Sequence, residues 1–442
     1  MITKKTVYIS RFVPGRALSL LWACVLVVNP VAAQEQDEST VIYESSYFAQ
    51  YNAVTLTDMI RNIPGGDTIL RRGGGSGGSN NRGFGASDSQ VLINGRRMSG
   101  KINNMSTALA RIQAAQVERI ELIRGNAEGL DIRNEGTIYN VILQEGAGNS
   151  SSSLLDIGLT EIDGMATEPA VLASYNASRG PLEFGFSYQY ETRPRLNKVD
   201  EDVLNADRTP REYRFLFNAQ TRNNHIFTGN LDYEFQSGAI LQLNGLVSDN
   251  DSLSDRVEDQ FLIGAGGIQI PSSIEEGEFS DLNQEFEVGG ALEFDVGTLG
   301  RLKTMFVLNR TENDDQIIQD EITNDIRSRL FSSVADYDEG ETILRSAMTT
   351  VLGRHTLEYG AEAAFNTLDR TFAFNSDPLE NAIVEEDRYE LFVTHSILLT
   401  EKISLQSALT EEYSTIFQDR EGQTNERSFR YLKPRVELRY DL

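Results

Sequence analysis

Leu182 to Glu191 reads LEFGFSYQYE, and its side chains alternate in character with a period of two. The even positions carry leucine, two phenylalanines and two tyrosines, and the odd positions carry only small, polar or acidic residues. Because successive side chains of a β-strand point to opposite faces, this stretch predicts a strand with one apolar face. Residues 286–296 and 357–365 repeat the pattern. A soluble β-sandwich would alternate in the same way, so the period alone does not identify the solvent.

The connections between such stretches alternate between very short and long. The short ones lie at 179–181, 236–238, 297–300, 353–354 and 400–401, and the long polar ones lie near 193–212, 263–282, 313–341, 366–387 and 418–428. Tight turns on one rim and long loops on the other are typical of an outer-membrane β-barrel. About twelve strands fit between residues 154 and 442 if 213–235 and 239–262 are single long strands. This alternation favours a membrane barrel over the sandwich.

The first 33 residues have the three parts of a secretory signal peptide. Lys4, Lys5, Arg11 and Arg16 precede an apolar run that ends before the small-residue site Val31-Ala32-Ala33. The run is shorter than the roughly 20 residues that span a bilayer, which favours a cleaved signal over a membrane anchor. Cys24 is the only cysteine, so the mature chain is expected to carry no thiol. We expect the mature protein in the outer membrane of a Gram-negative bacterium.

The residue types that catalysis and metal binding need are sparse. Three histidines are scattered at 225, 355 and 395, and no P-loop lysine, HExxH or serine-histidine-aspartate grouping occurs. The sequence therefore predicts no enzyme, no cofactor and no metal site. The chain has 40 basic and 66 acidic residues, which makes nucleic acid an improbable partner. Acidic residues crowd between Asp249 and Asp281, and we expect them to form loops that disfavour strongly anionic ligands.

The acidic charge is confined to one part of the chain. Residues 34–150 contain 11 basic and 13 acidic residues, whereas residues 151–442 contain 25 and 53. The two parts meet near the linker 146–153. The first part mixes a predicted helix over 57–63, stopped by Pro64-Gly65, with strands near 90–93, 117–124 and 137–143. The turn Asn94-Gly95 follows the first of these strands. These elements predict a compact α+β unit.

Arg71 to Gly85 reads RRGGGSGGSNNRGFG, a run almost without side chains. It formally contains the dinucleotide-binding pattern GxGxxG, but no helix is predicted to open after it, as that site requires. An arginine-glycine RNA-binding tail is disfavoured because the run lies between a helix and a strand of an acidic, secreted chain. A close-packed or mobile loop remains, in which glycine allows backbone approaches that other residues forbid. The loop glycines are Gly73, Gly74, Gly75, Gly77, Gly78, Gly83 and Gly85.

Five ordered motifs carry a family resemblance. They are residues 58–65 (DMIRNIPG), 82–85 (RGFG), 91–97 (VLINGRR), 117–125 (VERIELIRG) and 135–142 (EGTIYNVI). This series resembles the plug domain of TonB-dependent outer-membrane receptors. The resemblance implies a plug inside a 22-stranded barrel, with Arg82, Glu118 and Arg124 in contact with the barrel wall. It also places a TonB box near the mature N-terminus, where Thr40, Val41, Ile42 and Tyr43 form a β-prone run. The alternative for this run is the first strand of the plug itself.

These inferences divide the chain into a signal peptide (1–33), an N-terminal segment (34–45), a plug domain (46–148) and the N-terminal part of a barrel (149–442). Twelve strands are too few to enclose a plug, so we expect an incomplete barrel, about 12 strands of a likely 22, with its last strand unpaired. The expected partners are a TonB-type periplasmic energy transducer, outer-membrane lipid and a small ligand: an iron chelate, cobalamin or a glycan. The predicted function is energy-coupled uptake, for example of a ferric siderophore. The alternatives are a non-transporting binding or structural protein and an inactive truncated receptor.

Overall fold

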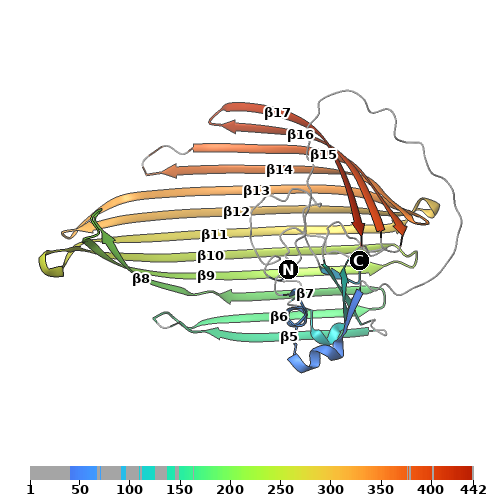
Figure 1. The fold of residues 1–442 in the computed structure, drawn as a ribbon, viewed down its shortest axis with the longest axis horizontal. Helices are drawn as coiled ribbons and strands as arrows, with labels where there is room; N and C mark the ends of the chain where they lie inside the picture. The colour runs from blue at the N-terminus through green and yellow to red at the C-terminus, as the bar shows by residue number, and fades with distance from the viewer. Residues whose placement is uncertain are drawn as a thin grey trace. The chain divides into compact units, whose positions relative to one another are not determined.

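The computed structural model describes residues 40–66, 91–95, 112–124, 137–144, 149–162, 164–375, 380–400 and 403–440, together with 70, 109 and 377. Within these ranges the chain forms two sheets, one of four strands before residue 144 and one of thirteen strands from residue 149 (Figure 1). No helix in the described ranges is long and apolar enough to cross a bilayer. The predicted signal peptide and the glycine-rich run lie outside the described residues.

The first sheet belongs to an α+β unit, as the sequence predicts. Its strands are β1 (Thr40–Glu44), β2 (Val91–Ile93), β3 (Val117–Arg124) and β4 (Thr137–Leu143), in the order β1-β3-β4-β2. β3 runs antiparallel to both β1 and β4, and β2 runs parallel to β4. Two short 3₁₀ helices, η1 (Ser45–Tyr51) and η3 (Ala114–Gln116), follow β1 and precede β3. β1 therefore stands at one edge of this sheet.

The helix α1 (Leu56–Arg61) begins one residue earlier than the sequence predicts, because Thr55 caps it. The Thr55 hydroxyl accepts a hydrogen bond from the Asp58 backbone N–H at 3.3 Å, and the Asp58 carboxylate accepts one from the Thr55 N–H at 3.0 Å. This reciprocal capping box satisfies two backbone donors that the first turn leaves unpaired. The helix ends before Pro64, and Gly65 takes a positive φ of 86° that L-residues rarely adopt.

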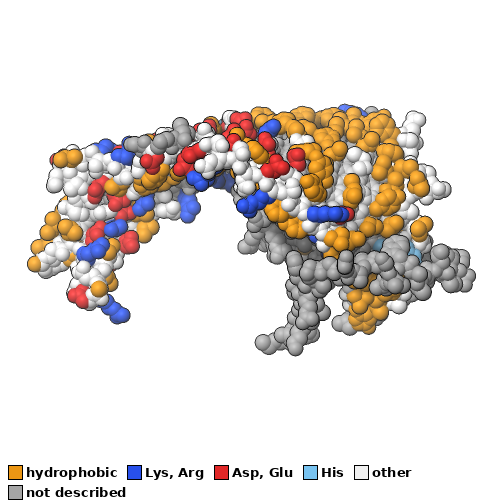
Figure 2. Space-filling model, turned by 90° about the horizontal axis from the view of Figure 1, so that it is seen from above, with side chains coloured by type: hydrophobic (Ala, Val, Ile, Leu, Met, Phe, Trp, Pro, Cys, Tyr) orange, Lys and Arg blue, Asp and Glu red, His pale blue; other side chains and the backbone are white. Residues whose placement is uncertain are grey.

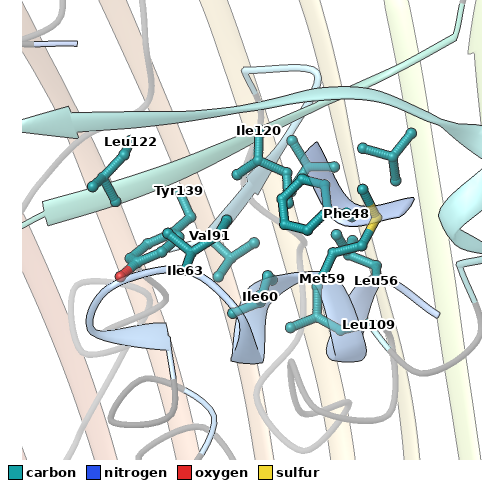
Figure 3. Close-up of a cluster of buried hydrophobic side chains, with 12 residues drawn as sticks. Phe48, Leu56, Met59, Ile60, Ile63, Val91, Leu109, Ile120, Leu122 and Tyr139 are labelled. Carbon is teal, nitrogen blue, oxygen red and sulfur yellow. The ribbon is translucent and has the colours of Figure 1, made fainter. Parts of the chain in front are cut away.

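The core of this unit lies between α1 and one face of the sheet. Figure 3 shows Leu56, Met59 and Ile60 of the helix pointing toward Ile120, Leu122 and Tyr139 of the strands. The Tyr139 hydroxyl donates to the Pro64 carbonyl at 2.7 Å, which ties β4 to the end of the helix segment. The opposite face of the sheet carries a smaller apolar cluster of Leu92, Ile123 and Ile138. Apolar side chains therefore pack on both faces of this short sheet.

The second sheet is entirely antiparallel and contains strands of unequal length. The shorter ones are β5 (Asn149–Thr160), β6 (Glu168–Arg179), β7 (Leu182–Thr192), β8 (Arg195–Leu204), β16 (Ile403–Arg420) and β17 (Gln423–Tyr440). The longer ones are β9 (Pro210–Glu234), β10 (Ile240–Ile263), β11 (Gln269–Asp295), β12 (Arg301–Thr323), β13 (Ile326–Leu352), β14 (His355–Phe374) and β15 (Glu380–Thr400). The short 3₁₀ helices η4 (Ala265–Gly267) and η5 (Gly297–Leu299) lie in two of the connections.

The strands follow one another in chain order from β17 to β9, and then β7, β6 and β5 continue the sheet (Figure 1). β8 is the exception, because it pairs with the first half of β9 while β7 pairs with the second half. β5 and β17 stand at the two edges, and no described strand joins them. The prediction of an antiparallel, incomplete barrel wall with an unpaired last strand is confirmed for the described residues.

The two faces of this sheet invert the usual distribution of side chains. One face, called here the Leu344 face, exposes apolar side chains such as Phe286, Leu344 and Leu391. The other, called the Arg345 face, buries charged ones such as Glu287, Arg345 and Glu362. The alternation in 182–191 and 286–296 produces this division. Figure 2 shows apolar side chains gathered over one part of the strand length and charged ones over the other.

The strands extend further than the sequence predicts. The long links expected at 193–212, 263–282, 313–341 and 366–387 are mostly strand: β8 fills the first, and β11 to β15 fill the others. The polar links are instead short, as between β10 and β11 at 264–268 and between β12 and β13 at 324–325. These strand segments carry charged residues on both faces, so the period of two that marks a half-buried strand is lost. The acidic residues between Asp249 and Asp281 therefore lie mainly on β10 and β11 and not in loops.

Candidate functional site

The edge strand β1 contains all four residues of the candidate TonB box. Thr40 pairs with Ile123 and Tyr43 with Ile120, so the run forms the first strand of the α+β unit. Val41 and Ile42 are 40% and 52% exposed, although both are large apolar residues. No described strand pairs with the other edge of β1. Because a strand edge presents unpaired N–H and C=O groups, this edge can accept a further strand.

Aromatic packing anchors the end of β1. The ring of Tyr43 lies 5.1 Å from that of Tyr47 and 6.5 Å from that of Phe48, measured between centroids. Phe48 is buried in the main core, and Tyr43 packs against the same cluster. The side chain of Tyr43 thus connects the exposed strand with the core beneath α1.

A polar network crosses the face of the sheet opposite α1. The Asn140 side chain accepts a hydrogen bond from the Gly95 N–H at 2.7 Å and donates one to Glu121 at 2.8 Å. Arg119 donates to Glu121 at 2.8 Å and to Glu118 at 2.6 Å. Burial opposes the charge of Arg119, but Glu121 and Glu118 outweigh it and raise the pKa of the guanidinium. The network joins the turn after β2 to β4 and β3.

The turn Asn94-Gly95 is present where the sequence predicts it. Asn94 and Gly95 have φ angles of 49° and 76°, in the left-handed region that asparagine and glycine tolerate best. The Asn94 side chain accepts a hydrogen bond from the Leu143 N–H at 2.9 Å. The turn is therefore fixed to β4 at two places, through Asn94 itself and through the contact between Gly95 and Asn140.

The other predicted site residues are only partly described. Glu118 is half-exposed and forms its ion pair with Arg119 within the same unit. Arg124 ends β3 and pairs with Thr137 through the backbone. Arg82 and the loop glycines Gly73, Gly74, Gly75, Gly77, Gly78, Gly83 and Gly85 lie outside the described residues. Contact of Arg82, Glu118 and Arg124 with the barrel wall stays a prediction.

Sequence reasoning assigned no role to Asn140 or Glu121, although both lie in the quoted motifs. Their partners stand 45 and 19 positions away in the sequence, and only the sheet brings them together. Asn140 sits within an apolar run in β4, TIYNVIL, and is itself buried. A lone asparagine inside such a run is the signal from which a buried hydrogen-bonding role could have been predicted.

The Arg345 face of the large sheet holds a second charged network. Glu362 accepts hydrogen bonds from Arg345 at 3.2 Å and from Arg388 at 3.1 Å. All three side chains are less than a tenth exposed. The Arg345 guanidinium also lies 3.8 Å from the centroid of the Phe392 ring, within the distance for a cation–π interaction. Neighbouring strands β13, β14 and β15 contribute these residues, so the network ties three strands together.

A family model described as the TonB-dependent Receptor Plug Domain matches residues 32–134. The chain carries a TonB-dependent receptor plug domain. The match includes β1, α1, β2 and β3, and thus all four residues of the candidate TonB box. In this plug domain the candidate box is paired with β3, and two of its apolar side chains, those of Val41 and Ile42, are exposed.

Solved structures give a similar but weaker comparison. The ferric yersiniabactin uptake receptor FyuA from Yersinia pestis is 11% identical over 91% of this chain and 79% of its own, with a TM-score of 0.29. The unliganded ferric citrate transporter FecA is 11% identical over 92% and 75%, with a TM-score of 0.26. The siderophore receptor PiuA from Acinetobacter baumannii is 10% identical over 90% and 79%, with a TM-score of 0.24. No curated protein matches the sequence. Because these TM-scores and identities are low, the assignment of the plug domain rests on the match to the family model.

Proposed function

We propose that this chain is an outer-membrane receptor that imports a scarce solute with energy from a TonB-type periplasmic transducer. The observation that carries the proposal is β1, an edge strand of a plug domain with Val41 and Ile42 exposed. Partners commonly join such an edge as an added strand, through backbone hydrogen bonds.

The large sheet supports the membrane location. Near the short turns, the Leu344 face exposes apolar side chains and the Arg345 face buries charged ones, the reverse of a water-soluble protein. Transmembrane barrels have this inversion, because lipid surrounds the outside and water or polar groups fill the inside. The Arg345 face then lines the passage, and the Leu344 face contacts lipid.

The ligand is proposed from the family alone. Ferric siderophores are common ligands of TonB-dependent receptors, so a ferric siderophore is the first solute to test. Cobalamin and glycans follow. Growth on single iron, cobalamin or glycan sources, with and without the gene, separates these classes.

Neighbouring proline substitutions test the role of β1. Consecutive residues of a strand direct their N–H groups to opposite edges, so Val41 and Ile42 face different edges of β1. Proline removes the N–H at either position, and Val41→Thr and Ile42→Thr keep it. We expect the proline that faces the free edge to abolish most uptake of a radiolabelled ferric siderophore while surface binding persists. The threonine variants keep uptake.

Two controls make the result decisive. Outer-membrane fractionation shows that each variant is inserted, and deletion of residues 40–43 gives the uptake of a fully uncoupled receptor. If both prolines and the deletion leave uptake unchanged, the proposal fails and a non-transporting binding or structural protein is the better description.

A further inference from the structure

The exposed apolar residues of the Leu344 face form a band of constant height beside the short turns. On five strands the band covers about nine residues, which at ~3.4 Å per residue and a tilt of ~35° is about 25 Å, the height of the apolar band on outer-membrane barrels. These segments are residues 227–235, 286–294, 357–365, 389–397 and 432–440. Every second residue in each is on the Leu344 face, and His395 is the only one among them with an acidic or basic side chain apart from tyrosines.

Aromatic residues mark the limit of the band farthest from the short turns. Phe227, Phe286, Phe365 and Tyr389 occupy this limit on β9, β11, β14 and β15, and each is exposed. The rings of Phe365 and Tyr389 lie edge to face, 6.0 Å apart between centroids. Aromatic girdles stand at the interfaces of outer-membrane barrels, where a ring meets both lipid and water.

Beyond the apolar band, acidic side chains appear on the same face of most of these strands. Asp387 follows Tyr389 on β15, and Asp249 follows Val247 on β10. The acidic residues within a few positions of the limit are Asp249, Asp251, Glu312, Asp314, Asp336, Asp338, Asp369, Glu385, Asp387 and Glu411. The basic residues within the same distance of the limit are His225, Arg310 and Arg430. The change from apolar to acidic therefore recurs on six strands, β10 and β12 to β16.

The line that joins these changes is oblique to the strands. Val247 on β10 is in register with Phe286, but further along the sheet Asp387 on β15 is in register with Phe365. From one strand to the next, the limit thus moves toward the short turns by about one residue, or ~3.4 Å. Because neighbouring strands lie ~4.8 Å apart, this shift corresponds to a tilt of about 35°. Strands of outer-membrane barrels tilt by about 35–45°.

The short turns follow a parallel line. Ile240, the first residue of β10, pairs with Glu293, two residues before β11 ends. Arg301 pairs with Thr349 three residues before β13 ends, and His355 pairs with Ile397 three residues before β15 ends. The turns and the aromatic limit thus shift in the same direction at a similar rate. The line of short turns and the aromatic limit are therefore parallel, and they enclose an apolar band of constant width.

We propose that the outer limit of the bilayer hydrocarbon crosses the sheet along this line, called here the boundary line. The inference rests on the proposed outer-membrane location and adds the depth of the protein in the membrane. Side chains of the Leu344 face on the turn side of the boundary line contact acyl chains. Those beyond it meet headgroups and water with an acidic surface, and the remaining length of β9 to β13 stands outside the bilayer.

Single-cysteine variants test the boundary line. Cys24 is the only cysteine, so Cys24→Ala gives a background without a competing thiol. Leu391→Cys and Glu385→Cys lie on opposite sides of the line on the same face of β15, and Val288→Cys and Glu278→Cys do so on β11. Thr394→Cys lies next to Val393, within the apolar band of β15, but on the Arg345 face, which makes it the control for the face.

Each variant of the full chain is spin-labelled in phosphatidylcholine vesicles, and collisions with oxygen are compared with collisions with a water-soluble nickel chelate. Oxygen collisions should exceed nickel collisions several-fold at Leu391 and Val288, and the ratio should reverse at Glu385 and Glu278. Thr394 should lack the oxygen excess of Leu391. Equal ratios on the two sides of the line would overturn the proposal. Failure to float with the vesicles would instead refute the membrane location itself.

Discussion

Glu362 is a single residue that stabilises two buried positive charges on the Arg345 face. It accepts from two guanidinium groups, those of Arg345 and Arg388, and all three side chains are almost fully buried. Removal of the carboxylate leaves two buried cations without their common partner. By contrast, Arg430 pairs with Glu411 at a site where the arginine is 76% exposed. The two ion pairs differ mainly in their contact with water.

We expect Glu362→Gln to destabilise the folded chain by about 3 kcal/mol, because breaking a buried ion pair typically costs about 3–5 kcal/mol. The matched variant Arg430→Gln should cost less than about 1 kcal/mol, since exposed pairs contribute little. Urea unfolding in detergent, followed by circular dichroism, measures both. Similar midpoints for the two variants would contradict the structural role of Glu362.

At the scale of the elements, Asn140 connects three strands of the plug domain. It lies on β4, bonds to Glu121 on β3 and receives the N–H of Gly95 after β2. β2 has only three residues, and its parallel pairing with β4 covers those three alone. The side chain of Asn140 therefore supplements a short backbone ladder.

Asn140→Leu should destabilise the plug domain by about 1–3 kcal/mol, the usual cost of leaving buried polar groups without a partner. Hydrogen exchange of the full chain is the measurement, and the amides of β2 and of the turn at Gly95 should exchange faster. Asn94→Asp is the control, because aspartate tolerates the left-handed conformation and keeps the side-chain oxygen that accepts from the Leu143 N–H. Unchanged protection of β2 in Asn140→Leu would show that the backbone ladder suffices.

The sequence predicted those elements in which local pattern and tertiary environment agree. Apolar side chains of Leu182–Glu191 lie on one face of the strand and polar ones on the other. The alternation in the sequence therefore predicted both the strand and its two faces. β8 and the outer halves of β11 to β13 have polar surroundings on both sides, so their strands were taken for loops. The contacts of Asn140 were not predictable, because they depend on the register of β3 with β4 and on the turn after β2. Pairing of Thr40–Tyr43 with β3 was one of two alternatives that the sequence left open.

At the scale of the whole molecule, the Leu344 face should tolerate charge differently at different depths. Val393 lies in the middle of the apolar band on β15, and Asp387 lies just beyond the boundary line. Val393→Arg should cost about 2–4 kcal/mol, and Asp387→Arg about 0–1 kcal/mol, as for arginine at the midplane and at the interface of a membrane barrel. Urea unfolding in phosphatidylcholine vesicles compares them. Equal costs would mean that the face is not immersed in lipid.

The strand order also bears on how the large sheet is assembled. From β9 to β16 every strand pairs with its predecessor and its successor in the chain, and β8 is the only interruption between β7 and β9 in the described sheet. Each pairing thus closes a short loop, and the entropy lost at each step is small. The wall can grow by one hairpin at a time, with each completed edge serving as the template for the next strand. A defect within one hairpin then stops growth at that point and leaves the strands already paired intact.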